Sequence, residues 1–320
     1  MAKRWAMVSR MDEMVYDNID ATVISMDNGR AVDRLYDAAR EVTVAPLCLS
    51  VARELEKLKE KGKVFLTTGF PILHEDEVLC ETDGPLGIVR LAYGLSLMDI
   101  ETVIITGNLY AKPLLKLINS QFSNAKFMII RSEKKMEDQF RALLNEHKPD
   151  MMIAVESPGR SHDDRYYNMN GMDITSYVTP IDLMFEMASD LDIKTVGIGD
   201  GGNEIGMGGI RSAVERYVRN GDKIASKVKT DYLMVGSTSN WASYGLLAAL
   251  SNLIKKPLLC DGKMEESLLK KCANLGLVDG ILKTIETSVD GFDIAENKAI
   301  ILRLIKETKF DELASWGDIE

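Results

Sequence analysis

Six short apolar runs in the middle of this 320-residue chain constrain its fold more than any other feature. Each is about as long as a buried strand and lacks polar alternation, which is typical of parallel strands covered on both faces. The runs are residues 64–66, 103–105, 127–130, 151–155, 195–198 and 232–235. Helical patterns separate them. This alternation predicts βαβ units and one α/β fold, with a doubly wound, mostly parallel sheet of about six strands and helices on both faces.

Helical patterns also flank this core. Val32, Leu35 and Ala39 share one face of a predicted helix over residues 31–41, and residues 243–255, 264–275 and 295–308 are also helical in pattern. No segment rich in Pro, Gly or Ser divides the chain. We therefore predict a single α/β domain over residues 1–320. It has a helical N-terminal part (1–61), a parallel-sheet core with the site loops (62–242) and a helical C-terminal part (243–320).

The charge balance limits the partners. Asp and Glu number 49 against 39 Lys and Arg, a formal net charge of -10, so the surface as a whole repels nucleic acid and anionic lipid. The most apolar stretch, residues 241–254, is shorter than the roughly 20 residues that span a bilayer. The first residues lack the apolar region of a targeting signal. We expect a cytoplasmic protein with a small-molecule substrate, and a homo-oligomer is left open.

Polar and glycine-rich segments follow five of the six predicted strands. Ligands of open parallel sheets bind beyond the carboxyl ends of the strands, so these segments predict one site along one edge. The segments are Thr67-Thr68-Gly69, continuing to Glu81-Thr82-Asp83-Gly84-Pro85-Leu86-Gly87; Thr106-Gly107-Asn108; Glu156-Ser157-Pro158-Gly159-Arg160; residues 199–206; and Gly236-Ser237-Thr238-Ser239-Asn240-Trp241.

The glycine-rich segment over residues 199–206 admits several interpretations. Backbone N–H groups at Gly201 and Gly202 could bind an anion. The segment from Gly197 to Gly202 also matches G-x-G-x-x-G, with Asp222 at about the distance of a ribose-binding acid. However, Asp200 and Glu204 would repel a pyrophosphate, and no lysine supports a Walker A loop. Both acids with Asn203 could instead bind an amine or a divalent cation, or simply cap a tight turn.

Two further segments carry charged candidates. Arg160 has the planar fork that binds carboxylates, and Glu156 at a strand end could act as a base or bind an ammonium group. Alternatively, Glu156 and Arg160 form an internal ion pair that orders their loop. Asp83 could contribute to the site or serve as the N-cap of a helix with Pro85 in its first turn.

Taken together, these motifs resemble the D-glutamate cyclase-like family. The resemblance covers about residues 28–255. It is carried by Thr67-Thr68-Gly69-Phe70-Pro71, residues 81–87, residues 156–160, Tyr166-Tyr167-Asn168-Met169, residues 197–208, and Thr238-Ser239-Asn240-Trp241 with Tyr244-Gly245. It implies an α/β fold, conversion of D-glutamate to 5-oxo-D-proline and water, and a functional Asp83. In larger members this region resembles a C-terminal domain fused to a hydro-lyase-like domain.

Our first hypothesis is therefore a lyase, a carbon-oxygen hydro-lyase, that interconverts D-glutamate and 5-oxo-D-proline. The amine needs a general base, for which we predict Glu156 or Glu204. The developing negative charge needs donors, or a cation such as Mn²⁺ or Mg²⁺ held by Asp200 and Asp83. Arg160 is the predicted anchor of the α-carboxylate. The remaining predicted substrate-binding residues are Asp83, Asn203, Gly201, Gly202, Asn240, Thr68 and Tyr167.

Two other hypotheses stay open. The same pocket could be a binding module for an amino acid or small carboxylate, without turnover. The G-x-G-x-x-G match alone motivates a nucleotide- or NAD-dependent enzyme.

Overall fold

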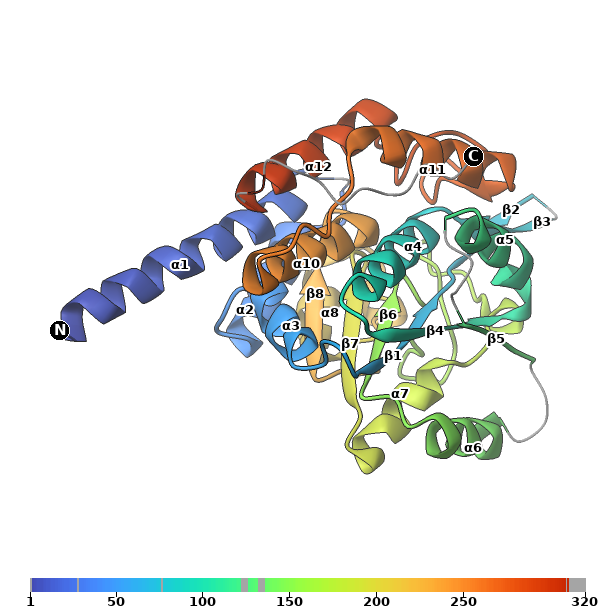
Figure 1. Cartoon of the computed structure of the whole chain (residues 1–320). Helices are drawn as coiled ribbons and strands as arrows, with labels where there is room; N and C mark the ends of the chain where they lie inside the picture. The colour runs from blue at the N-terminus through green and yellow to red at the C-terminus, as the bar shows by residue number, and fades with distance from the viewer. Residues whose placement is uncertain are drawn as a thin grey trace.

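The computed structural model describes residues 2–27, 29–75, 77–121, 126–131, 136–308 and 310. A six-stranded sheet with the order β5-β4-β1-β6-β7-β8 forms its centre, and every neighbouring pair is parallel. Its strands are β1 (Lys63–Thr68), β4 (Glu101–Gly107), β5 (Lys126–Ile130), β6 (Met151–Val155), β7 (Lys194–Gly199) and β8 (Tyr232–Val235). The predicted doubly wound α/β sheet is confirmed (Figure 1).

The strand order creates a break at the centre of the sheet. From β1 the chain moves outward through β4 and β5, and then it returns to the other side of β1 and continues through β6, β7 and β8. The carboxyl ends of β1 and β6 are therefore the topological switch point, where ligands of such sheets bind. There Thr68 at the end of β1 is paired in register with Val155, and Glu156 follows.

Alternate residues of the strands face two separate apolar cores. In β1, Val64 and Leu66 belong to a core with α4 and α10, whereas Phe65 belongs to a core with α6 and α7. Figure 1 shows these helix pairs on opposite sides of the sheet. Helices therefore cover both faces, as predicted. The helices between the strands are α4 (Asp83–Ser96), α5 (Asn108–Asn119), α6 (Met136–His147), α7 (Asp182–Ala188), α8 (Arg211–Tyr217) and α9 (Gly221–Ile224).

The two ends of the chain pack together against α10 (Ser239–Ile254). Helices α1 (Ala2–Val23), α3 (Leu47–Glu56) and α12 (Ile294–Thr308) all contact it, and Ile19, Trp241 and Leu304 share the first core. Helices α2 (Val32–Val42) and α11 (Gly262–Asn274) complete these additions. Within the described ranges, no helix is both long and apolar enough to cross a membrane.

A second, three-stranded sheet was not predicted. Strands β2 (Pro71–His74) and β3 (Glu77–Glu81) form an antiparallel hairpin between β1 and α4. Strand β9 (Leu277–Val278) pairs with the end of β3. Residues 277 and 278 were too few to give a strand pattern within a part of the chain predicted to be helical. This small sheet brings the loop after β9 to the carboxyl edge of the main sheet.

Candidate active site

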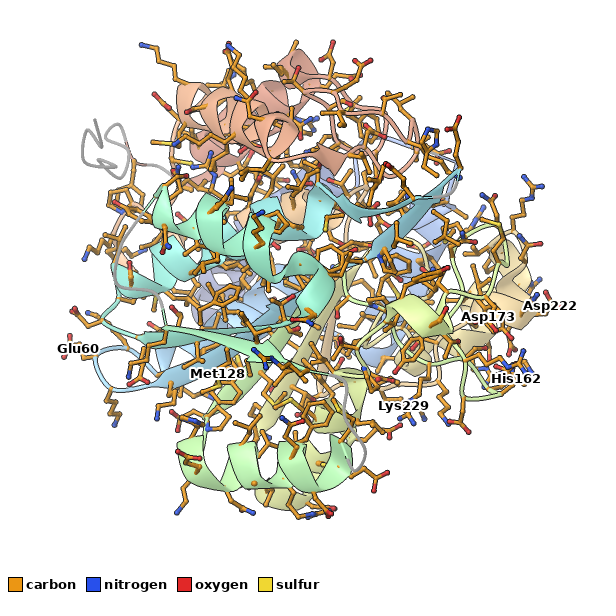
Figure 2. The ribbon with its side chains drawn as sticks, turned by 90° about the vertical axis from the view of Figure 1, so that its right-hand side faces the viewer. Glu60, Met128, His162, Asp173, Asp222 and Lys229 are labelled. Carbon is orange, nitrogen blue, oxygen red and sulfur yellow. The ribbon has the colours of Figure 1, made fainter. Side chains whose placement is uncertain are left out.

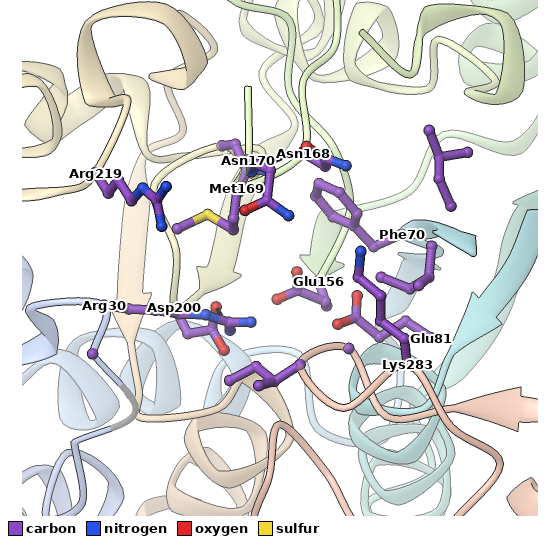
Figure 3. Close-up of a pocket in the computed structure, with 16 residues that line it drawn as sticks. Arg30, Phe70, Glu81, Glu156, Asn168, Met169, Asn170, Asp200, Arg219 and Lys283 are labelled. Atoms are coloured by element: carbon purple, nitrogen blue, oxygen red, sulfur yellow. Dashed lines mark hydrogen bonds and ion pairs between the residues drawn. The ribbon is translucent and has the colours of Figure 1, made fainter. Parts of the chain in front are cut away.

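A cavity of about 350 Å³ opens at the carboxyl edge of the main sheet, beside the switch point. Main-sheet loops contribute Glu156, Asp200 and Asn203, and the small sheet contributes Glu81. The other lining residues are Gly29, Arg30, Phe70, Ile72, Leu73, Asn168, Met169, Asn170, Arg219, Gly280, Ile281 and Lys283. Figure 3 shows Glu81, Glu156 and Lys283 directed at the same central space, with Arg30 and Asp200 beside it. The site is therefore assembled from both ends of the chain as well as from the sheet.

Glu156 occupies the first position after β6 in an unusual backbone conformation. Its φ is +43°, in the left-handed region that costs a non-glycine residue about 1–2 kcal/mol. Its N–H donates to the carbonyl of Ile198 at 3.1 Å and its carbonyl accepts from Gly69 at 3.1 Å, which fixes it between neighbouring strands. The Ser239 hydroxyl donates to its Oε2 at 2.6 Å. The strained backbone of Glu156 is thus held in place by these hydrogen bonds, and its carboxylate lies at the cavity wall.

Asp83 joins the starts of two helices. It lies in the first turn of α4, and its carboxylate accepts the N–H groups of Ser239 at 2.8 Å and Asn240 at 2.5 Å, at the start of α10. Asp83 is therefore not the N-cap of its own helix; that position is Thr82. A Cβ on Gly84 would lie 1.9 Å from the Thr68 Oγ1, so this close approach requires glycine.

Arg30 connects two carboxylates from distant parts of the chain. Its guanidinium is 2.5 Å from the Asp200 Oδ1, after β7, and it contacts both Asp290 carboxylate oxygens at 2.7 and 3.2 Å. The other oxygen of Asp200, Oδ2, is buried and has no hydrogen-bond partner among the described residues. Arg30 therefore binds only one of the two carboxylate oxygens of Asp200.

Five buried carboxyl groups surround this guanidinium: Glu81, Asp83, Glu156, Asp200 and Asp290. Burial, followed by repulsion between neighbours, raises the pKa of Asp83 to about 8. Burial also raises the pKa of Glu81, Glu156 and Asp200 well above ordinary values, with additional repulsion from nearby carboxylates. Such a site retains protons or attracts cations, and groups with shifted pKa values in a cavity are typical of catalytic sites.

The family model for the C-terminal domain of D-glutamate cyclase-like proteins matches residues 20–305. This chain belongs to the D-glutamate cyclase-like family. The predicted resemblance is thereby confirmed, and the match runs past residue 255 to include the loop after β9, which contributes Lys283 and Asp290.

The chain is also similar to a human protein, mitochondrial D-glutamate cyclase. It is 35% identical to this chain over 221 residues, which are 66% of this chain and 34% of the human protein. The chain thus spans about a third of the length of this curated relative.

In the present chain, the glycine-rich segment over residues 199–206 binds the side chain of its own residue Glu204. The Glu204 carboxylate accepts the N–H groups of Asp200, Gly201 and Gly202 at 2.9, 2.6 and 2.7 Å. These amides therefore bind Glu204, as in the tight-turn interpretation. Asp222 is exposed at the outer edge of the molecule in Figure 2, so this arrangement does not favour a dinucleotide.

Other predicted residues lie around the cavity or away from it. Asn203 lines it, and its amide donates to the Tyr167 carbonyl at 2.8 Å, while the Tyr167 hydroxyl binds Asp163 at 2.6 Å. Thr68 lines a smaller neighbouring cavity, and its buried hydroxyl has no partner among the described residues. The Asn240 side chain is buried and lies 3.3 Å from the Tyr244 hydroxyl.

Arg160 does not line the main cavity. Its guanidinium pairs with Asp182 at 2.7 Å and Glu186 at 2.5 Å. The alternative prediction of an ion pair between Glu156 and Arg160 is therefore wrong, because Arg160 pairs with acids of α7 instead.

Several charged residues at the site carried no predicted role. Glu81 lay inside a segment that was singled out, so its position before Asp83 was a usable signal. Arg30, Asp290, Arg219 and Lys283 lie in irregular segments near the ends of predicted helices and gave no signal. Arg219 and Lys283 form no ion pair with any residue that the structure describes. They supply positive charge that Arg160 was expected to provide.

Proposed function

We propose that this chain is a lyase that closes D-glutamate to 5-oxo-D-proline with release of water. Family membership supports the reaction class. The observation that carries the proposal is the charge distribution of the cavity, where Lys283 and Arg219 accompany the buried acids Glu81 and Glu156. Glutamate has two carboxylates and one ammonium group, and this cavity offers charges opposite to all three.

The two cations suit the two carboxylates of the substrate. Lys283 is half-buried and points into the cavity in Figure 3, and the exposed Arg219 lies at its edge. In this arrangement Lys283 binds the γ-carboxylate near the acids, and Arg219 binds the α-carboxylate. The ammonium group then faces Glu81 and Glu156. A cavity of about 350 Å³ lies within the range of small-molecule sites.

Glu81 is our preferred general base. Its carboxyl group is 3% exposed, lines the cavity, and has a pKa raised by burial, which makes its ionised form a stronger base. The substrate ammonium beside it favours that ionised form. Glu81 takes one proton from the ammonium, and the amine nitrogen attacks the γ-carboxyl carbon. Glu81 then passes this proton, and after it a second proton from the attacking nitrogen, to the leaving oxygen. A C–N bond forms, a C–O bond breaks, and one oxygen leaves with two ammonium protons as water.

Chiral mass spectrometry of products tests this proposal. Purified full-length chain is incubated separately with D-glutamate, L-glutamate and 5-oxo-D-proline. We expect interconversion of D-glutamate and 5-oxo-D-proline only. Glu81→Gln should lower turnover about 100-fold or more, whereas Lys283→Ala and Arg219→Ala should mainly raise KM. Lys229→Ala, at the surface in Figure 2, is the matched control. Turnover unchanged in Glu81→Gln would exclude Glu81 and return the role to Glu156.

A binding module without turnover is the second candidate. It is favoured by the cations of the cavity, because Lys283 and Arg219 can bind a small carboxylate without any reaction. Calorimetry distinguishes the two functions, because a module binds D-glutamate and yields no product on prolonged incubation. Absence of both binding and turnover with D-glutamate would contradict both candidates.

A further inference from the structure

Three buried carboxylates lie close together at the cavity, which Glu156 and Asp200 line and Asp83 does not. One oxygen each of Asp83, Glu156 and Asp200 lies within 4.8 Å of the others, and these side chains come from α4 and from the loops after β6 and β7. Asp83 and Asp200 are 1% exposed and Glu156 is 5% exposed. Three charged oxygens brought together away from water repel each other unless protons or a cation compensate them.

The protein groups around these oxygens leave one of them without a partner. Arg30 binds only the Oδ1 of Asp200, and the buried Oδ2 has no hydrogen-bond partner among the described residues. Arg30 is also shared with Asp290. Asp83 and Glu156 accept hydrogen bonds from neutral donors at the start of α10, which add no full positive charge. The buried Asp200 Oδ2 is therefore free to bind a cation.

We propose that Asp83, Glu156 and Asp200 bind one divalent cation of the Mg²⁺ or Mn²⁺ type. All three ligands are carboxylate oxygens, which these hard cations prefer. Oxygens bound to one Mg²⁺ at about 2.1 Å lie roughly 3–4.2 Å apart, so three oxygens that lie within 4.8 Å of one another would draw closer together around the ion. A substrate ammonium fits less well, because Asp83 does not line the cavity whereas Glu156 and Asp200 do. A small ion reaches all three and keeps open positions toward the cavity.

The role of this ion rests on the proposed function, although its binding does not. An ion held there faces the region of the cavity that binds the γ-carboxylate, and it would stabilise negative charge on that group during amine attack. Glu156 then serves as a ligand, which leaves Glu81 as the base.

Manganese binding to the full chain tests the site. Protein stripped with EDTA and dialysed is titrated with Mn²⁺, and free Mn²⁺ is followed by its electron paramagnetic resonance signal. We expect one ion per chain, with affinity at least tenfold weaker in Asp83→Asn and in Asp200→Asn. Asp190→Asn removes an exposed carboxylate outside the cavity and should bind like wild type. Competition by Mg²⁺ at higher concentration should restore the free Mn²⁺ signal.

Two outcomes overturn the inference. One is no saturable Mn²⁺ binding by wild-type protein, a result that does not depend on any variant folding. The other is unchanged Mn²⁺ affinity in both Asp variants, whose folding is checked by circular dichroism. Failure of the proposed function gives a different result, namely Mn²⁺ binding without conversion of D-glutamate. If the stripped protein converts D-glutamate and wild-type protein shows no Mn²⁺ binding, the cation site is rejected and the proposed lyase function stands.

Discussion

Arg30 forms a 2.5 Å ion pair with Asp200, although the two residues lie 170 positions apart in the sequence. Arg30 lies between α1 and α2 in the N-terminal helical part, and Asp200 follows β7 of the central sheet. The side chains are 11% and 1% exposed. The same guanidinium binds Asp290 before α12, so one buried cation connects the sheet edge to both ends of the chain.

Arg30→Ala should strongly destabilise the protein. It leaves Asp200 and Asp290 as buried carboxylates without their cation, and breaking a buried pair in this way costs about 3–5 kcal/mol. Urea unfolding followed by circular dichroism measures the change. Arg34→Ala is the control, because Arg34 is 57% exposed and its pair with Asp33 is worth about 0–1 kcal/mol. Equal stability of the two variants would contradict a structural role for Arg30.

Gly84→Ala should displace the start of α4 and with it Asp83. The new Cβ would lie 1.9 Å from the Thr68 Oγ1 and 3.0 Å from the Val155 carbonyl oxygen, so the helix end has to move. We expect a loss of about 1–3 kcal/mol in stability and a larger proportional loss of activity. A Cβ on Gly209 meets no atom within 4 Å, so Gly209→Ala should behave like wild type in both assays. Wild-type activity in Gly84→Ala would show that this close approach is dispensable.

The stability of chelated protein should fall as pH rises through the pKa of Asp83. Burial raises this pKa from 3.8 to about 8, so the folded state binds the proton more tightly than the unfolded state. The resulting stabilisation is fully present below pH 3.8 and is lost as pH rises through about 8. Tm in EDTA at about pH 6 and about pH 9 measures this fall.

Asp83→Asn is the control for this pH dependence, because it has no charge to gain. Neighbouring carboxyl groups with raised pKa values, such as Glu81, also lose their protons as pH rises, so Tm falls to some extent in both proteins. The fall in Tm should therefore be smaller in Asp83→Asn than in wild type. An identical fall would exclude Asp83 as a contributor.

Asp279 should control the loop that carries Lys283 and Asp290. Its buried carboxylate accepts the N–H groups of Ile281, Leu282 and Gly291. It also accepts the hydroxyl of Ser288 at 2.6 Å. Asp279→Ala removes all four bonds, and we expect KM for D-glutamate to rise about tenfold because the loop loses its position. Asp293→Ala removes one exposed hydrogen bond, from the Glu296 N–H to the Asp293 carboxylate at the start of α12, and serves as control. Equal KM values in Asp279→Ala and Asp293→Ala would show that Asp279 does not position the loop.

Much of the fold was predictable because its strands are uniform. Residues 151–155 are apolar throughout, since both faces of β6 are covered, and this signal survives in a single sequence. The hairpin of β2 and β3 gave no such signal, because its outer residues, such as His74 and Glu77, are exposed. Its partner β9 has only two residues.

The candidate site was predictable only where it follows the strands. Glu156, Asp200 and Asn203 were found because the carboxyl ends of parallel strands share one edge. Arg30 and Asp290 were missed, since their meeting depends on how α1 and α12 pack against α10. For Arg160, the sequence indicated the chemistry of its side chain, but its partner Asp182 lies in a later helix and only the folded structure reveals it.

The order in which a ribosome makes this chain determines when the contacts of the buried Arg30 guanidinium can form. Arg30 emerges early, Asp200 much later and Asp290 near the end, so the contact that unites them forms only after synthesis of the sheet is complete. A nascent chain that stops before α11 already contains the strands of the central sheet, but it lacks Lys283 and Asp290. The cavity proposed as the active site is therefore completed as a late event in the biogenesis of the protein, after the strands of the central sheet have been translated.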